Sequence, residues 1–106
     1  SATYVRDLVS AVLRLLAEGK TGVYNVVNPQ EFSKEALARE YAAAFGLDPR
    51  LIVGKPAAYF NSAAPRPSHA VLSTGKIEAL GISIRPVQEA VAEMKKRKAE
   101  DDVYPA

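Results

Sequence analysis

The residue best suited to chemistry in this sequence is Arg66, which lies between two prolines in the run Ala-Pro-Arg-Pro-Ser at positions 64–68. Pro65 and Pro67 each fix their own φ angle at about −65°, and a residue that precedes a proline is pushed toward extended geometry. A guanidinium on so stiff a backbone suits a phosphate, because its planar fork bonds two phosphate oxygens at once. Composition alone favours the alternative, an ordinary surface arginine in a proline-rich loop.

No metal centre and no nucleophilic centre is predicted elsewhere in the chain. The sequence has a single histidine, His69, and no cysteine, so it lacks the thiolates and paired imidazoles that bind most metals. We interpret His69 as a solvated loop residue. The sequence contains no nucleophile elbow and no phosphate-cradling glycine loop. Five glutamates have the pattern of solvated charges on helix faces rather than of a catalytic pair: those at positions 35, 40, 78, 89 and 93.

The length and composition predict one globular domain that spans residues 1–106. The chain is 48% hydrophobic and 25% charged, which is typical of a folded, soluble protein. Its net charge of +2 is too small for a nucleic-acid-binding protein, and its basic cluster at 95–98 complements the dipole of a predicted helix end. No apolar run reaches the roughly 18 residues of a membrane span. The lack of cysteine and of a signal peptide favours the cytoplasm.

Apolar side chains at helical spacing predict four helices. The first covers about residues 5–18. The second is the best signalled, because Ser33 is a suitable N-cap and Gly46 a suitable C-terminal stop. A short third helix is expected from a cap at Ser73 to Gly81, and Pro86 suits the first position of the last helix.

Two apolar runs between these helices predict β-strands. Residues 23–27 are apolar on both faces, which is the pattern of an interior strand, and residues 51–54 form a second short run. A helix between two strands favours parallel pairing. Ile82 and Ile84 alternate with polar residues, so one face of that connection is expected to be buried. We therefore predict an α/β fold with about four helices and two to four short strands.

The long loop at residues 55–69 is predicted to be functional, because a loop of this length is unusual in a compact domain. Tyr59 and Phe60 form an aromatic pair within it. The pair could act as a lid over a sugar or base, although cover for the core or for a partner surface is the favoured interpretation.

Several short motifs together resemble a known family. An Ala-x-Arg-Pro segment at 64–67 is followed by Leu-Ser-x-x-Lys at 72–76 and Leu-Gly at 80–81, while residues 3–8 and 22–26 resemble a helix start and the strand after it. In this order they resemble the C-terminal substrate-binding region of extended short-chain dehydrogenase/reductases that act on sugar nucleotides. The resemblance is greatest to the dTDP-4-dehydrorhamnose reductases.

This resemblance implies a role and two site residues. Arg66 matches an arginine that contacts the nucleotide diphosphate, and Ser68 could add a hydroxyl bond to phosphate or ribose. The complete enzyme would reduce a 4-keto sugar nucleotide with NADPH or NADH, for deoxysugar and cell-surface polysaccharide synthesis. The implied partners are a dTDP-sugar substrate, an N-terminal Rossmann half that completes the NAD(P)-binding reductase, and a second copy in a homodimer.

The chain itself is predicted to lack catalytic, cofactor-binding and metal-binding residues. A dinucleotide site needs Gly-x-Gly-x-x-Gly, and the family's catalytic pair is Tyr-x-x-x-Lys. Neither spacing occurs here, so we expect no hydride transfer by this chain alone. The six glycines lie at positions 19, 22, 46, 54, 75 and 81.

Two other functions stay open at this point. One is a non-catalytic regulatory or interaction module built on the same fold. The other is a fragment of a nucleotide-sugar epimerase or dehydratase.

Overall fold

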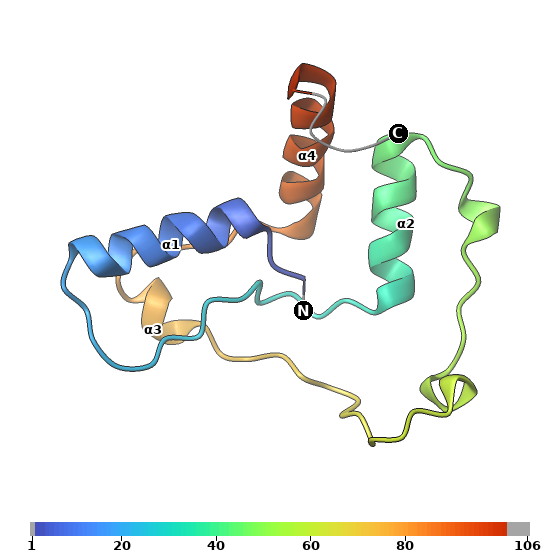
Figure 1. The fold of residues 1–106 in the computed structure, drawn as a ribbon, viewed down its shortest axis with the longest axis horizontal. Helices are drawn as coiled ribbons and strands as arrows, with labels where there is room; N and C mark the ends of the chain where they lie inside the picture. The colour runs from blue at the N-terminus through green and yellow to red at the C-terminus, as the bar shows by residue number, and fades with distance from the viewer. Residues whose placement is uncertain (1, 102–106) are drawn as a thin grey trace.

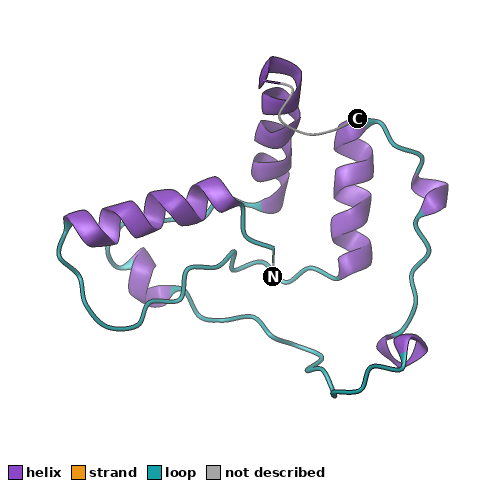
Figure 2. Cartoon of the chain, viewed as in Figure 1, coloured by secondary structure: helices purple, strands orange, loops and turns teal. Residues whose placement is uncertain are grey.

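The computed structural model describes residues 2–101, and every regular element in that range is helical (Figure 2). The elements in chain order are α1 (Val5–Ala17), α2 (Lys34–Phe45), the 3₁₀ turns η1 (Pro49–Leu51) and η2 (Ala57–Phe60), α3 (Gly75–Glu78) and α4 (Val87–Asp101).

The four α-helices form two pairs. Helices α2 and α4 lie side by side and contact each other, while the short α3 packs beneath α1 (Figure 1). The chain between α2 and α3, residues 46–74, runs around the outer edge of the molecule, with only the two 3₁₀ turns as regular structure. This edge carries the proline-rich segment with Arg66.

The caps predicted for α2 are confirmed. The Ser33 hydroxyl oxygen accepts a hydrogen bond from the backbone N–H of Ala36 at 3.0 Å, which satisfies one of the free amides of the first turn. Gly46 ends the helix with φ at +65°, a left-handed conformation that glycine adopts without steric cost. The N-cap predicted for α3 is wrong by one residue: the N-cap residue is Thr74 and not Ser73.

Two small apolar clusters hold the helix pairs together. The first buries Ala11 of α1 against Ile77 of α3, together with Ile82 and Ile84. Ile77 is only 1% exposed, and full burial of such a side chain stabilises the fold by about 1.5–3 kcal/mol. The second cluster lies between α2 and α4, and its buried residues are Ala42, Val87, Ala90 and Val91.

The α/β prediction is wrong, because no strand occurs among residues 2–101. Residues 23–27 form an irregular segment that pairs with no neighbouring strand; instead, the Lys76 Nζ donates to the Val23 carbonyl at 2.8 Å, and the Asn25 amide donates to the Ser73 carbonyl at 3.2 Å. The second predicted strand is also absent, since Leu51 ends a 3₁₀ turn and is 81% exposed. A β-rich run becomes a strand only where another strand supplies its hydrogen bonds.

A polar anchor fixes the start of α4. Asn28 is 2% exposed, and its side-chain oxygen accepts from the backbone N–H of Gln30 at 2.9 Å. The Gln30 side-chain oxygen in turn accepts from the backbone N–H of Val87 at 2.7 Å, which caps the first turn of α4. The segment before α2 is therefore tied to α4 by hydrogen bonds as well as by apolar packing.

The molecule is flat and open for its length. Its principal extents are 47 × 40 × 20 Å and its radius of gyration is 16.4 Å, against about 13 Å for a compact domain of 100 residues. Large apolar side chains stay exposed along α1, among them Leu13 at 61% and Leu16 at 70%. No helix within residues 2–101 combines the length and the apolar character needed to cross a lipid bilayer.

Candidate functional site

The predicted phosphate-binding segment lies beside a hollow on the surface, which we call the loop hollow. Its volume is about 590 Å³, and it lies between the 67–71 segment and the start of α2. Its lining residues are Ala2, Glu31, Phe32, Ser33, Lys34, Leu37, Pro67, Ser68, His69, Ala70 and Val71.

The two predicted site residues take different places at this hollow. Ser68 lines it directly. Arg66 does not line it but precedes Pro67, which does, and all of residues 61–70 are exposed. Within the described part of the chain, the Arg66 guanidinium makes no ion pair or ring contact. Its charge is therefore available to an anionic ligand.

His69 makes a contact between the segment that carries these residues and the segment before α2. Its Nδ1 makes a short contact with a carboxylate oxygen of Glu31, just before α2. The His69 side chain is 80% exposed, so the predicted solvated histidine is confirmed, but its partner was not predicted. No local sequence pattern could have paired two residues that lie 38 positions apart.

The polar groups of the loop hollow suit an anion at one end. Lys34 lines the hollow at the first position of α2, where the free amides of the helix carry partial positive charge. The Ser33 hydroxyl is already used as the helix cap, which leaves the Ser68 hydroxyl at the opposite wall. Glu31 brings a negative charge, and it is the charge that His69 contacts.

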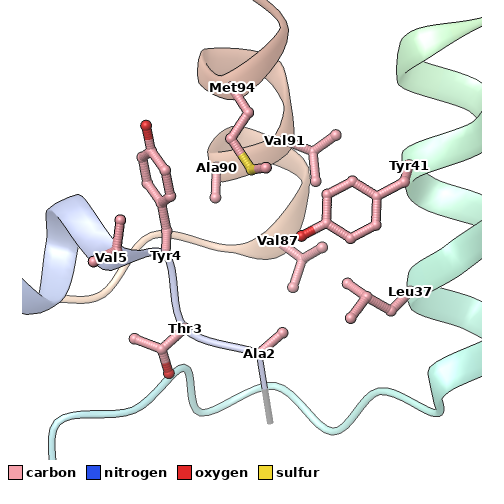
Figure 3. Close-up of a pocket in the computed structure, with 10 residues that line it drawn as sticks. All are labelled: Ala2, Thr3, Tyr4, Val5, Leu37, Tyr41, Val87, Ala90, Val91 and Met94. Carbon is pink, nitrogen blue, oxygen red and sulfur yellow. The ribbon is translucent and has the colours of Figure 1, made fainter. Parts of the chain in front are cut away.

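A second hollow lies between α2 and α4, and we call it the helix crevice (Figure 3). Its volume is about 250 Å³. Tyr41 extends from α2 toward α4, with its hydroxyl directed toward Val87 at the start of α4 (Figure 3). The lining residues are mostly apolar: Ala2, Thr3, Tyr4, Val5, Leu37, Tyr41, Val87, Ala90, Val91 and Met94.

Sequence reasoning missed the helix crevice. Leu37 and Tyr41 belong to the apolar stripe of α2, and that of α4 consists of Val87, Ala90, Val91 and Met94. Both stripes do face each other, but their side chains leave a space between them (Figure 3). A stripe predicts which residues meet and does not predict how completely they fill the interface.

The aromatic pair of the long loop contributes to neither hollow. Tyr59 and Phe60 form an edge-to-face pair with ring centroids 5.3 Å apart, and Lys55 lies over the Tyr59 ring at 5.0 Å. Both rings are about two-thirds exposed, at 64% and 66%. They therefore cover no core of the described chain, and a role against a partner surface stays a prediction.

The described residues offer no candidate metal centre. Within residues 2–101, no three histidine, cysteine, aspartate or glutamate side chains gather closely enough to hold a metal ion.

Comparison with known proteins places the chain in a family. Residues 1–100 match the family described as the RmlD substrate binding domain, and the chain belongs to this family. It is also similar to the spore coat polysaccharide biosynthesis protein SpsK of Bacillus subtilis (strain 168), with 34% identity over 93 residues. That match covers 88% of this chain and 32% of the relative, so the chain spans about a third of the relative's length. No solved structure matches the chain.

The family match confirms the resemblance predicted from the short motifs. It identifies the chain as a substrate-binding domain of that family. The match extends across α1, α2, α3 and nearly all of α4, so both hollows lie within it.

Proposed function

We propose that this chain is the nucleotide-sugar-binding domain of a dTDP-4-dehydrorhamnose reductase-like enzyme, in which Arg66 holds the diphosphate of the substrate. The observation that supports this most directly is the state of Arg66: an exposed guanidinium without an ion pair among the described residues, on a segment beside a hollow. The family match supports the substrate class.

Arg6, like Arg66, is exposed and makes no ion pair among the described residues, but it lies on α1 and lines neither hollow. Four other arginines already have partners. Arg39 and Arg50 each pair with a nearby carboxylate, at 2.9 and 3.0 Å. Arg14 donates to the Leu80 carbonyl, and Arg85 pairs with two acids. A phosphate that binds Arg66 would break no such contact, so the full charge-assisted hydrogen bond would add to the affinity.

The backbone around Arg66 reduces the entropy lost on binding. Pro65 and Pro67 limit the conformations of the segment, and His69 contacts Glu31 in the segment before α2. A side chain held on a prepared loop loses less conformational freedom when its ligand arrives. Ser68 would donate its hydroxyl to a phosphate or ribose oxygen from the wall of the loop hollow.

The reduction of a 4-keto sugar belongs, in this proposal, to residues outside the chain. None of the six glycines has the spacing of a dinucleotide-binding turn, so the residues present do not fit NADPH or NADH. A Rossmann half would bind the nicotinamide cofactor, in a cytoplasmic enzyme that forms homodimers. The role of this chain would be to bind and orient the sugar nucleotide.

The test is the affinity for dTDP, measured by isothermal titration calorimetry. We expect Arg66→Ala to weaken binding roughly 10- to 150-fold, because a hydrogen bond to a charged group contributes about 1.5–3 kcal/mol. Arg50→Ala is the matched control, since it removes the same charge from an exposed arginine that does not line either hollow. We expect the control to keep the affinity of the unchanged chain.

Two results would contradict this proposal. If dTDP does not bind, or binds equally well after Arg66→Ala, the chain is better described as a non-catalytic interaction module. An epimerase or dehydratase would share the binding result and differ only in the reaction of the whole enzyme.

A further inference from the structure

The loop hollow and the helix crevice share a wall. Ala2 and Leu37 line both, so the two spaces are neighbours on the same side of α2. Their chemistry differs. The loop hollow has charged and hydroxyl groups, including Lys34 and Ser68, with Arg66 at its edge, whereas the helix crevice is lined mainly by apolar side chains.

We propose that the helix crevice receives the planar base of the nucleotide whose diphosphate lies at Arg66. This inference rests on the proposed function, because the diphosphate is the covalent link between the two ends. A nucleoside diphosphate has two chemically different parts that match the two hollows. One is a charged diphosphate that needs cations, and the other is a ring with two largely apolar faces. Arg66 and Lys34 supply the charge that complements the first part.

The lining of the crevice favours the base over the sugar. A hexose exposes hydroxyl groups around its ring, and each would lose its water partners among Val87, Val91 and Met94. The hydroxyl groups in the lining, those of Thr3, Tyr4 and Tyr41, are fewer than a polyol needs, so the crevice disfavours a hexose. The faces of a pyrimidine lose little on leaving water and gain from contact with an aromatic ring.

Tyr41 is the residue that we assign to the base. Its ring extends from α2 across the crevice toward α4 (Figure 3). Behind it, the Phe45 ring lies one helical turn away, with a centroid distance of 6.5 Å and a tilt of 31°, and so supports the position of the Tyr41 ring. Met94 faces the same space, and its unbranched thioether can adapt to a ring of variable shape.

The sequence offers a direct probe, because Met94 is the only methionine in the chain. Labelling with ¹³C-methyl methionine gives one NMR signal, which reports on the helix crevice alone. We expect dTDP to shift this signal and to show a nuclear Overhauser effect between its thymine methyl and the Met94 methyl. Inorganic pyrophosphate, which has no base, should bind in an Arg66-dependent way and leave the signal unmoved.

A pair of variants supplies the second test. We expect Tyr41→Leu to weaken dTDP binding roughly 5- to 150-fold, the range for the loss of one base–aromatic stack, and to leave pyrophosphate affinity unchanged. Leucine keeps the crevice apolar. Tyr59→Leu makes the same chemical change at an exposed ring outside both hollows and should alter neither affinity.

The outcomes separate this inference from the proposed function. If dTDP binds through Arg66 while the Met94 signal stays unmoved and Tyr41→Leu has no effect, the base lies elsewhere and only this inference is overturned. If a dTDP-sugar moves the Met94 signal and dTDP does not, the crevice takes the sugar, and the inference is again overturned. If neither dTDP nor pyrophosphate binds, both proposals are overturned together. Should Tyr41→Leu fail to fold, the Met94 measurement on the unchanged chain still decides.

Discussion

Asp7 joins parts of the chain that are far apart in sequence. Its carboxylate accepts from the Arg85 guanidinium at 2.8 Å and from the Arg85 backbone N–H at 3.2 Å, and its side chain is only 9% exposed. Arg85 also pairs with Glu93 of α4 at 2.6 Å and lies over the Tyr4 ring at 5.3 Å. The hydrogen bond that Arg85 donates to Asp7 is the main reason that the pKa of Arg85 is raised above its ordinary value, against the opposing effect of burial; Glu93 adds to the rise.

We predict that Arg85→Met destabilises the fold by about 1–3 kcal/mol, because it leaves the buried Asp7 carboxylate without its cation. Urea unfolding followed by circular dichroism would measure this loss. A cation whose pKa is raised on folding contributes its full stability at every pH below its ordinary pKa in the unfolded chain, and loses that stability only as the pH rises through the folded pKa. The loss should therefore be the same at pH 7 and pH 9.

The double variant Asp7→Asn/Arg85→Met is the control for this pair. It removes the unpaired charge, so it should be more stable than Arg85→Met alone. If the single variant unfolds at the same urea concentration as the unchanged chain, the pair does not stabilise the fold.

Helix α2 is the element on which both hollows depend. Leu37 lines both of them, Tyr41 lines the crevice, and Lys34 lines the loop hollow. The helix starts where its amides are capped by Ser33 and stops at Gly46 in the left-handed conformation. Because local groups define both ends, the register of its side chains was predictable before any tertiary contact was known.

We predict that Ser33→Ala costs about 1 kcal/mol of stability, within the range of about 0.5–2 kcal/mol for removal of an N-cap side chain. The free energy of unfolding in urea measures it. Ser33→Asp should keep the stability of the unchanged chain, because a carboxylate caps the same amides and suits the helix dipole. Equal losses for the alanine and aspartate variants would show that the hydroxyl does not act as a cap.

At the scale of the whole molecule, the exposed apolar side of α1 is the feature that best supports the proposed partners. Six apolar residues of this helix are 38–70% exposed: Val5, Leu8, Val9, Val12, Leu13 and Leu16. They recur at helical spacing and so form one continuous stripe, which we call the α1 stripe. A monomeric protein rarely exposes a large contiguous apolar patch. In the proposal above, either a Rossmann half or a second copy would cover it.

We predict that the isolated chain self-associates through the α1 stripe and that Leu13→Glu weakens the association by at least tenfold. Sedimentation equilibrium over a range of concentrations would measure it. Leu51→Glu introduces the same charge at a leucine that is 81% exposed but lies in η1, outside the stripe, and should have no effect. A chain that stays monomeric at every concentration, or equal weakening by both variants, would contradict a homodimer interface on α1.

The two predicted strands, which do not form, show why a local sequence pattern can lead to a wrong fold class. Residues 23–27 have the composition of an interior strand, but they form an irregular segment in the structure. Their expected partner, residues 51–54, instead forms part of a 3₁₀ turn and an exposed segment. A strand needs hydrogen bonds from another strand, and the identity of that partner is not written in either segment alone.

Local sequence was sufficient for the helices and for the family, because each helical hydrogen bond joins residues four positions apart and each family motif is a short run. It was not sufficient for contacts such as the one between Asp7 and Arg85, which lie 78 positions apart, or for the buried hydrogen bonds of Asn28. Local sequence also could not predict that the loop hollow and the helix crevice share Leu37 in their linings. These features depend on how separate elements pack, and packing is a property of the assembled chain rather than of any one of its segments.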